Sequence, residues 1–285
     1  MCCLFLAASS TVAIAQTSVV DLVNPIIGTN GMGHTFPGAC VPFGLVQLSP
    51  DTDTIPHNVD GKYQPRSYEY CAGYQHKDSS IVGFSHTHFS GTGHSDLGDI
   101  LIMPTTGTLK LNPGTATNPD GGYRSRFSHG TEISRPGYYE VMLTDYGVKA
   151  QLTTTQRVGI HKYTYPTNSE NQRIILDMIH GIYNYDGKVL WTNIRVENDT
   201  LVTGYRITNG WARTNYTYFA MSFSKPITHY GCEEKAKVNY RGGYAKFNMK
   251  ENFPDIGGRK IVAYFDFDPK TSDELEVKVA LSGVS

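Results

Sequence analysis

One stretch of the sequence concentrates residue types that do chemistry: residues 83–100, GFSHTHFSGTGHSDLGDI. His86 and His88 are two positions apart, so on a β-strand both imidazoles would point to the same face. His94 and two aspartates follow within reach of a loop that folds back. Imidazoles and carboxylates are the ligands of an open catalytic zinc site. The stretch therefore predicts a metal site, a sugar-binding wall or a turn-rich piece of scaffold.

The three interpretations differ in what the histidines do. A zinc hydrolase on His86, His88 and His94 matches only partly, because the H-x-H-x-D-H pattern of metallo-β-lactamases needs Asp and His where this chain has Ser90 and Gly91. As scaffold, the histidines would hydrogen-bond backbone carbonyls beside glycine turns. As a sugar wall, the polar side chains would bind hydroxyls, while the glycines let the backbone approach the ligand closely.

A second stretch has the same character: residues 24–39, NPIIGTNGMGHTFPGA, with four glycines and His34. A phosphate-binding loop would end in Gly-Lys-Ser/Thr and open a helix, and this one does neither. Loops longer than roughly 12 residues without their own secondary structure are usually functional. The stretch is therefore a second candidate for ligand contact. Trp191 and Trp211 are predicted to be buried rather than stacked on a sugar.

The elements that must position these loops have the character of β-strands. Runs rich in Val, Ile, Thr and Tyr recur between turn signals, and few windows show a helical period. The runs of strand length are 41–48, 81–84, 100–103, 138–143, 148–155, 159–165, 173–178, 201–208, 216–223, 236–240, 260–267 and 275–281. They predict one all-β domain, a large antiparallel β-sandwich with long loops and few short helices.

Charge narrows the class of partner. The chain of 285 residues has 25 Lys and Arg against 26 Asp and Glu. Nucleic-acid-binding proteins normally carry a basic patch, and this sequence has no basic run. A nucleic-acid partner is therefore not expected.

The N-terminus has the character of a targeting segment. Residues 1–15 are apolar and small, and Ala13-Ile14-Ala15 has the form that signal peptidase cuts. No Lys or Arg precedes the apolar run, which indicates a truncated start, and the run is too short to span a membrane. We expect a signal peptide at 1–15 and a mature protein that is secreted or periplasmic. Its remaining cysteines, Cys40, Cys71 and Cys232, are too few and too widely spaced for a disulfide framework, although one bridge stays open.

The two loops together are more specific than either alone. They carry a resemblance to the N-terminal domain of glycoside hydrolase family 92, the exo-acting α-mannosidases, in the segments NPIIGT, GHTFPGACVPFGLVQLSPDT and YEYCAGYQHKDSSIVGFSHTHFSGTGHSDLGDILIMP. The resemblance continues through PGYYEVMLTDYGVKAQLTTTQRVGIHKYTYP and YFAMSFSKPI, and so spans roughly residues 20–285.

The resemblance implies a β-sandwich domain at 16–285 that in the family packs on a C-terminal (α/α)6 barrel, here expected to be absent. Family members are mostly bacterial, exported and calcium-dependent, and they invert the anomeric centre while hydrolysing terminal α-mannosides of glycans. The general acid, the general base and most calcium contacts come from the barrel. The resemblance therefore places no catalytic residue in this chain, implies calcium as the cofactor of the whole enzyme, and implies that the chain alone is inactive.

The same resemblance implies that the sandwich shapes the sugar pocket, through Gly33, His34, Thr35, Phe36, His86 and His88. No metal ligand is assigned. Two alternatives stay open, a stand-alone carbohydrate-binding module and the zinc hydrolase on His86, His88 and His94.

Overall fold

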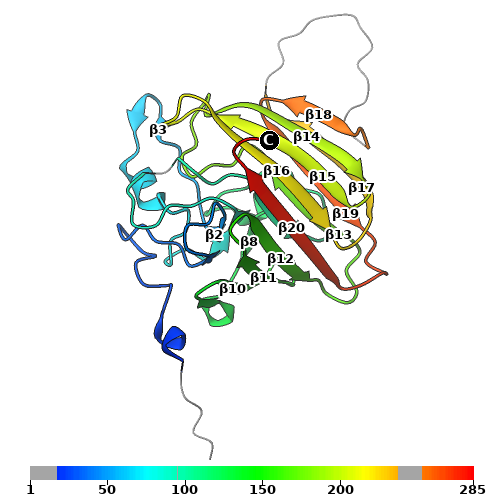
Figure 1. Cartoon of the computed structure of the whole chain (residues 1–285), viewed down its shortest axis with the longest axis horizontal. Helices are drawn as coiled ribbons and strands as arrows, with labels where there is room; N and C mark the ends of the chain where they lie inside the picture. Colours follow the sequence, from blue (N-terminus) through cyan, green and yellow to red (C-terminus); the bar gives the residue numbers. More distant parts are fainter. Residues whose placement is uncertain (1–17, 95, 237–251) are drawn as a thin grey trace, which may run out of the picture.

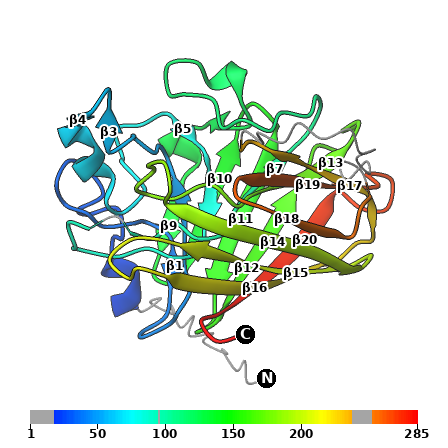
Figure 2. The ribbon, with the colours of Figure 1, turned by 90° about the horizontal axis from the view of Figure 1, so that it is seen from above.

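A computed structural model of the chain describes residues 18–94, 96–236 and 252–285. Two large antiparallel sheets lie face to face, and strands β14, β15, β16 and β20 of one sheet lie in front of β13, β17 and β19 of the other (Figures 1 and 2). The bounds of these strands follow sheet by sheet.

One sheet has nine strands, and its last strand in sequence lies at its centre. In spatial order the strands are β18 (Asp255–Gly258), β14 (Val189–Asn198), β15 (Leu201–Thr208), β16 (Asn215–Phe223), β20 (Glu274–Ser282), β12 (Val158–Thr164), β11 (Val148–Thr154), β10 (Tyr138–Leu143) and β9 (Ile133–Arg135). Buried and more exposed side chains alternate along β10, β11, β12 and β20. This is the pattern of a sheet with one face on the core and one facing water.

The other sheet has seven strands and is more deeply buried. In spatial order they are β1 (Ala39–Cys40), β2 (Gln47–Asp51), β6 (Gly83–Ser85), β7 (Leu101–Thr105), β13 (Gln172–Asp177), β19 (Ile261–Phe267) and β17 (Ile227–Glu234). Every residue of β7 and β13 is buried, so both faces of the sheet are covered there. Tyr123, from the segment between β7 and β8, is one of the residues that cover the second face. Its hydroxyl donates a hydrogen bond to Asp177 at 2.5 Å.

The remaining elements are short. Strands β3 (Asn58–Val59) and β4 (Lys62–Tyr63) pair with each other, as do β5 (Ser80–Ile81) and β8 (Ser125–Arg126). The helices in the described ranges are four 3-10 turns: η1 (Val19–Leu22), η2 (Pro65–Tyr70), η3 (Pro119–Gly121) and η4 (His129–Thr131). The predicted all-β sandwich with long loops and few short helices is confirmed.

The core lies between the two sheets and is built from both. Phe223 of β16 packs against Phe265 and Phe267 of β19, with ring centroids 5.7 and 4.9 Å apart. Phe84 of β6 faces Tyr163 of β12 at 6.3 Å. Burial of one such side chain contributes about 1.5–3 kcal/mol, so these cross-sheet contacts hold the two layers in register.

Most of the predicted runs correspond to strands, and the exceptions have physical causes. Among the longer strands, β14 and β17 were not predicted, and the run predicted at 41–48 is a turn except for its last two residues, which begin β2. β14 has a register shift between Val189 and Trp191 and a mixed burial pattern, which hides its period of two. The run predicted at 236–240 lies outside the described residues except for Ala236, and the predicted signal peptide at 1–15 lies outside them entirely.

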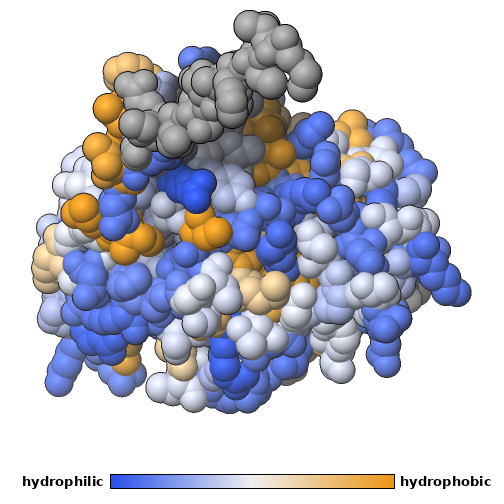
Figure 3. Space-filling view, turned by 90° about the horizontal axis from the view of Figure 1, so that it is seen from below, coloured by the Kyte–Doolittle hydropathy of each residue, from blue (hydrophilic) through white to orange (hydrophobic). Residues whose placement is uncertain are grey.

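Two further features concern cysteines and surface. Among the described residues, no disulfide joins Cys40, Cys71 or Cys232. In the described part of the chain, helices fall short of the length and apolar character that a membrane crossing requires. On the face drawn in Figure 3, hydrophobic side chains reach the surface in separate clusters among hydrophilic ones.

Candidate functional site

The two glycine-histidine loops, residues 24–38 and 86–99, lie side by side. The backbone N–H of Gly91 donates to the carbonyl of His34 at 2.6 Å. The Phe36 ring packs on the His88 ring, with centroids 5.3 Å apart. Segments about fifty residues apart in sequence therefore form one surface, which we call the two-loop site.

Glycine and one buried glutamine shape the first loop. Gly28 has a φ of +84° and accepts a hydrogen bond from the Thr35 N–H at 3.3 Å, which closes the loop on itself. Gln75 grips the middle of the loop: its amide accepts from Gly31 N–H at 2.8 Å and donates to Gly31 O at 3.0 Å. His34 has a φ of +51°, a strained conformation for a residue with a Cβ. Such strain persists where surrounding contacts fix the backbone, often at functional sites.

Aromatic rings form the rim of the two-loop site. Tyr68 of η2 meets the His34 ring edge to face at 4.9 Å, and Trp211 meets the His94 ring in the same way at 4.1 Å. Trp211 is 83% exposed and Phe89 40% exposed. Trp211 lies in the turn between β15 and β16, where its backbone N–H donates to Asp96 at 3.0 Å. Exposed rings beside polar groups suit a ligand with both apolar and hydrogen-bonding faces, such as a sugar.

The prediction that both tryptophans are buried is wrong. Trp191, on β14, is 41% exposed, and Trp211 is the more exposed of the two. Trp211 is on a turn, where backbone geometry rather than hydrophobicity decides the position of the side chain.

Two imidazole nitrogens of the site have no partner. Nε2 of His34 and Nε2 of His94 are buried, and neither has a hydrogen-bond partner in the described part of the chain. An unsatisfied buried polar group costs about 1–3 kcal/mol, so it is normally paired with protein, water or ligand. A hydroxyl both donates and accepts, so a ligand hydroxyl would fill that role once the imidazole rings turn outward to meet it.

His86 belongs to the core. Its Nδ1 donates to the Ile100 carbonyl at 2.6 Å, so its Nε2 accepts from Nε2 of His161 at 3.0 Å. His161 in turn accepts from the Tyr163 hydroxyl at 2.8 Å. Burial lowers the pKa of His86 to about 4 and that of His161 well below its usual range, so both rings are neutral. The chain of donors and acceptors is complete without a ligand.

His88 is buried in a second polar cluster, centred on Asp51 of β2. The ring donates from Nδ1 to the Gln47 carbonyl and from Nε2 to Asp51, both at 2.8 Å. Two acceptors select the doubly protonated, cationic ring. His180 donates to the other Asp51 oxygen at 2.7 Å. Burial alone would raise the pKa of the Asp51 carboxyl, but the two histidines outweigh it and hold that pKa well below its usual range.

The structure thus separates the residues predicted to shape the pocket. Gly33 is exposed, and the buried His34 has an unpartnered nitrogen in the site. Thr35 donates to Ile27 O at 2.9 Å within its own loop, and Phe36 is buried against His88. His86 and His88 are buried with protein partners at both ring nitrogens. Direct sugar contact by these six residues stays a prediction.

The alternative of a zinc centre on His86, His88 and His94 does not fit the described residues. The ring nitrogens of His86 and His88 already bond protein groups in two different clusters. Among the described residues, the one group of three or more ligand side chains close enough to share an ion lies elsewhere, at His76, His129 and Glu132. The spacing of the histidines in sequence reflects a strand end, at which the side chains turn into the core.

Gly73 is expected to be intolerant of substitution because it backs the Asp51 cluster. Its φ is +78°, and a Cβ there would lie 1.9 Å from Asp51 Oδ1. Gly73→Ala should lower the free energy of unfolding by about 2 kcal/mol or more, measured by urea denaturation. Gly137→Ala is the matched control, because its φ is +75° with nothing within 4 Å of the Cβ. Equal losses in the two variants would show that backbone strain alone matters.

Comparison with known proteins adds a family to this geometry. A family model described as the glycosyl hydrolase family 92 N-terminal domain matches residues 22–282. A family GH92 α-mannosidase from Bacteroides thetaiotaomicron, solved with mannoimidazole, is 40% identical with a TM-score of 0.80, over 93% of this chain and 32% of that one. An inverting mannosidase of the same family and organism is 26% identical with a TM-score of 0.69, over 95% of this chain and 32% of that one.

A curated relative is more distant. An uncharacterized secreted glycosidase of Arthroderma benhamiae is 28% identical over 170 residues, which are 56% of this chain and 19% of the relative. The chain therefore spans about a third of the length of the solved relatives and about a fifth of the curated one.

Proposed function

Because the chain belongs to glycosyl hydrolase family 92, of which it contains the N-terminal domain, we propose that it forms the carbohydrate-facing N-terminal part of an α-mannosidase. The whole enzyme would hydrolyse terminal α-mannosides of glycans with inversion, and its (α/α)6 C-terminal catalytic domain would be this domain's main partner. The proposal is supported by solved relatives that are an α-mannosidase and an inverting mannosidase. Secretion is supported by the apolar segment at 1–15 and by the name of the curated relative.

The observation that carries the proposal is the meeting of the two loops. The Gly91–His34 hydrogen bond joins the two loops, which carry the exposed Phe89 ring and the unpartnered nitrogens of His34 and His94, and the exposed Trp211 ring packs on His94. A sugar offers C–H faces that pack on aromatic rings and hydroxyls that bond imidazoles. The two-loop site combines both kinds of partner on one rim.

In this proposal the domain binds and orients the sugar but does not cleave it. An inverting glycosidase needs an acid and a base carboxylate roughly 6.5–9.5 Å apart, with room for a water molecule. The carboxylates near the loops are already engaged: Asp51 by His88 and His180, Asp99 by Arg206 and Thr87, and Asp96 by the backbone N–H of Trp211. The proposal therefore assigns the reacting pair to the partner domain.

Calcium does not fit the residues described in this chain. Ca²⁺ takes 6–8 oxygen ligands, mostly carboxylates and carbonyls. The two-loop site instead presents imidazoles and aromatic rings, and the group of ligand side chains at His76, His129 and Glu132 has two nitrogen donors. Calcium dependence of the whole enzyme stays part of the proposal, without any residue of this chain assigned to the ion.

The test combines turnover with binding. We expect the chain alone to show no turnover of an aryl α-mannoside, and to bind mannose with an affinity that calorimetry can measure. Trp211→Ala should weaken binding about tenfold, because one aromatic contact is worth up to about 1.5 kcal/mol. His34→Ala should weaken it as well.

Trp191→Ala is the matched control, because Trp191 is the other tryptophan and lies on β14, with its ring beside Gly257 of β18. Its mannose affinity should equal that of the parent chain. Robust turnover by the chain alone would contradict the division of labour. Binding that survives Trp211→Ala but is lost in Trp191→Ala would place the sugar elsewhere.

A further inference from the structure

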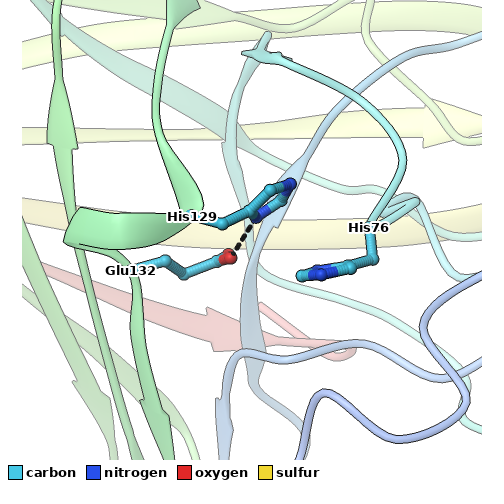
Figure 4. A group of neighbouring side chains, drawn as sticks. All are labelled: His76, His129 and Glu132. Carbon is cyan, nitrogen blue, oxygen red and sulfur yellow. Dashed lines mark hydrogen bonds and ion pairs between the residues drawn. The ribbon is translucent and has the colours of Figure 1, made fainter.

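Three side chains outside the two-loop site form a cluster with the donor set of a transition-metal site. His76 lies in the segment after η2, His129 lies in η4, and Glu132 directly follows η4 (Figure 4). One ligand atom from each lies within 4.8 Å of the others. The two imidazole rings are 4.0 Å apart, and His129 Nδ1 is 2.8 Å from a Glu132 oxygen. We call this group the His-His-Glu cluster.

The carboxylate of the cluster is held by a second layer of residues. The Tyr139 hydroxyl donates to Glu132 Oε1 at 2.6 Å, and the Tyr74 hydroxyl donates to the same oxygen at 2.9 Å. The Glu132 side chain is 3% exposed, while His129 remains accessible at 38%. Phe127 packs edge to face on the His129 ring at 5.0 Å. Outer partners of this kind orient metal ligands, and their loss typically weakens metal affinity 10–100-fold.

We infer that the His-His-Glu cluster binds Zn²⁺ or a similar divalent transition metal. Two imidazoles and one carboxylate are the three-ligand set of open zinc sites, with water as the fourth ligand. Such a set favours late first-row metals over Ca²⁺ and Mg²⁺, which prefer all-oxygen ligands. Zinc bonds of 2.0–2.2 Å place neighbouring ligand atoms ~3.3 Å apart. The ligand atoms, now up to 4.8 Å apart, would reach that spacing by rotation of the exposed His129 ring and the half-buried His76 ring.

The metal would act on the two-loop site through the backbone. The N–H of His76 donates to the Thr29 carbonyl at 2.8 Å, and the adjacent Gln75 grips Gly31 through two hydrogen bonds. Ser134, just beyond Glu132, donates to the Pro37 carbonyl at 2.6 Å. An ion shared by His76 and Glu132 would therefore fasten the first loop at both ends. The metal-bound cluster would thus restrain the backbone of that loop.

The inference is tested on the metal-free chain by titration with Zn²⁺ against a chromophoric chelator, and by the visible spectrum with Co²⁺. We expect one equivalent to bind, a tetrahedral Co²⁺ spectrum, and slower hydrogen exchange at the Gly31 and Thr35 amides when zinc is present. His129→Ala should weaken zinc binding at least about tenfold, and Tyr139→Phe should weaken it less.

His229→Ala is the matched control, because His229 is also 38% exposed and also faces a carboxylate, Asp266. It should bind zinc as the parent chain does. Circular dichroism of each variant separates lost ligands from lost folding, and Glu132→Gln provides a second ligand variant of similar shape. Absence of stoichiometric zinc, or equal loss in the His129 and His229 variants, would overturn the inference. Neither result bears on sugar binding by Trp211, so the two proposals fail independently.

Discussion

Asp51→Asn is expected to lower the free energy of unfolding by about 3–5 kcal/mol at neutral pH, because it breaks a buried ion pair and leaves one partner charged. Asp51 is fully buried and accepts hydrogen bonds from His88 and His180. An asparagine keeps the shape but loses the charge, and its NH₂ group would face an imidazole N–H. Urea denaturation of both proteins at pH 7 measures the difference.

The same substitution predicts a pH dependence. The pKa of Asp51 is lowered on folding, so its carboxylate stabilises the native state above the unfolded pKa of 3.8 and that contribution is lost as pH falls. The stability gap between the parent and Asp51→Asn should therefore shrink as pH falls below about 5. Asp186→Asn is the control: it removes the charge of an exposed ion pair with Lys260, and the midpoint of urea unfolding should stay that of the parent. A gap that is independent of pH would contradict this account.

Arg206→Met is expected to destabilise the domain by a similar amount, about 3–5 kcal/mol. Arg206, on β15, is fully buried, and its Nε donates to Asp99 at 2.8 Å. Burial would raise the pKa of Asp99, but Arg206 and the Thr87 hydroxyl hold it low. Loss of the guanidinium leaves a buried carboxylate with too few partners. Thermal and urea unfolding both measure the effect.

Two further variants make the Arg206 prediction specific. Asp99→Asn combined with Arg206→Met should be more stable than Arg206→Met alone, because no unpaired charge remains. Arg195→Met, on the neighbouring strand β14 and 59% exposed at its side chain, should change stability little. If the double variant is as unstable as the sum of the two single ones, packing rather than charge explains the loss.

Arg206 also links the two predictions, because it contacts both Asp99 and the backbone of His180, which belongs to the Asp51 cluster. One guanidinium nitrogen donates to the carbonyls of His180 and Met178, and the other side of the group holds Asp99 at the end of the second loop. His180 in turn donates to Asp51. A loss of Arg206 should therefore loosen the base of the two-loop site even where the domain still folds.

The fold could be predicted where one face of a strand meets water. In β10, β11, β12 and β20 a buried side chain follows a more exposed one, and that period of two is visible in the sequence. β14 and β17 escaped prediction because each contains a bulge, at Val189/Trp191 and at Ile227/His229, which interrupts the alternation. A bulge depends on the partner strand, which the local sequence does not identify.

The two loops of the site could be predicted from the sequence, but the contacts between their residues and the rest of the chain could not. His34 and its neighbours stood out because glycines and polar residues gather around them. Asp51 and His180 did not, since they lie 129 positions apart and meet only through the fold. Nothing in the local sequence marked Tyr68 as part of the site. The structure also explains why residue 93 is a glycine, since a Cβ there would lie 1.8 Å from the Tyr68 hydroxyl. The His-His-Glu cluster was missed for the same reason, because His76 is far in sequence from the other two.

The central position of β20 has a consequence for biosynthesis. Among the strands that the structure describes, β12 and β16 are joined only through β20, which pairs with β12 over seven residues and with β16 over six. A ribosome that has not yet released residues 274–282 carries two half-sheets whose facing edges are open to other strands. Chaperone protection would be needed most at this stage of translation, and a nascent chain stalled before residue 274 should aggregate rather than fold.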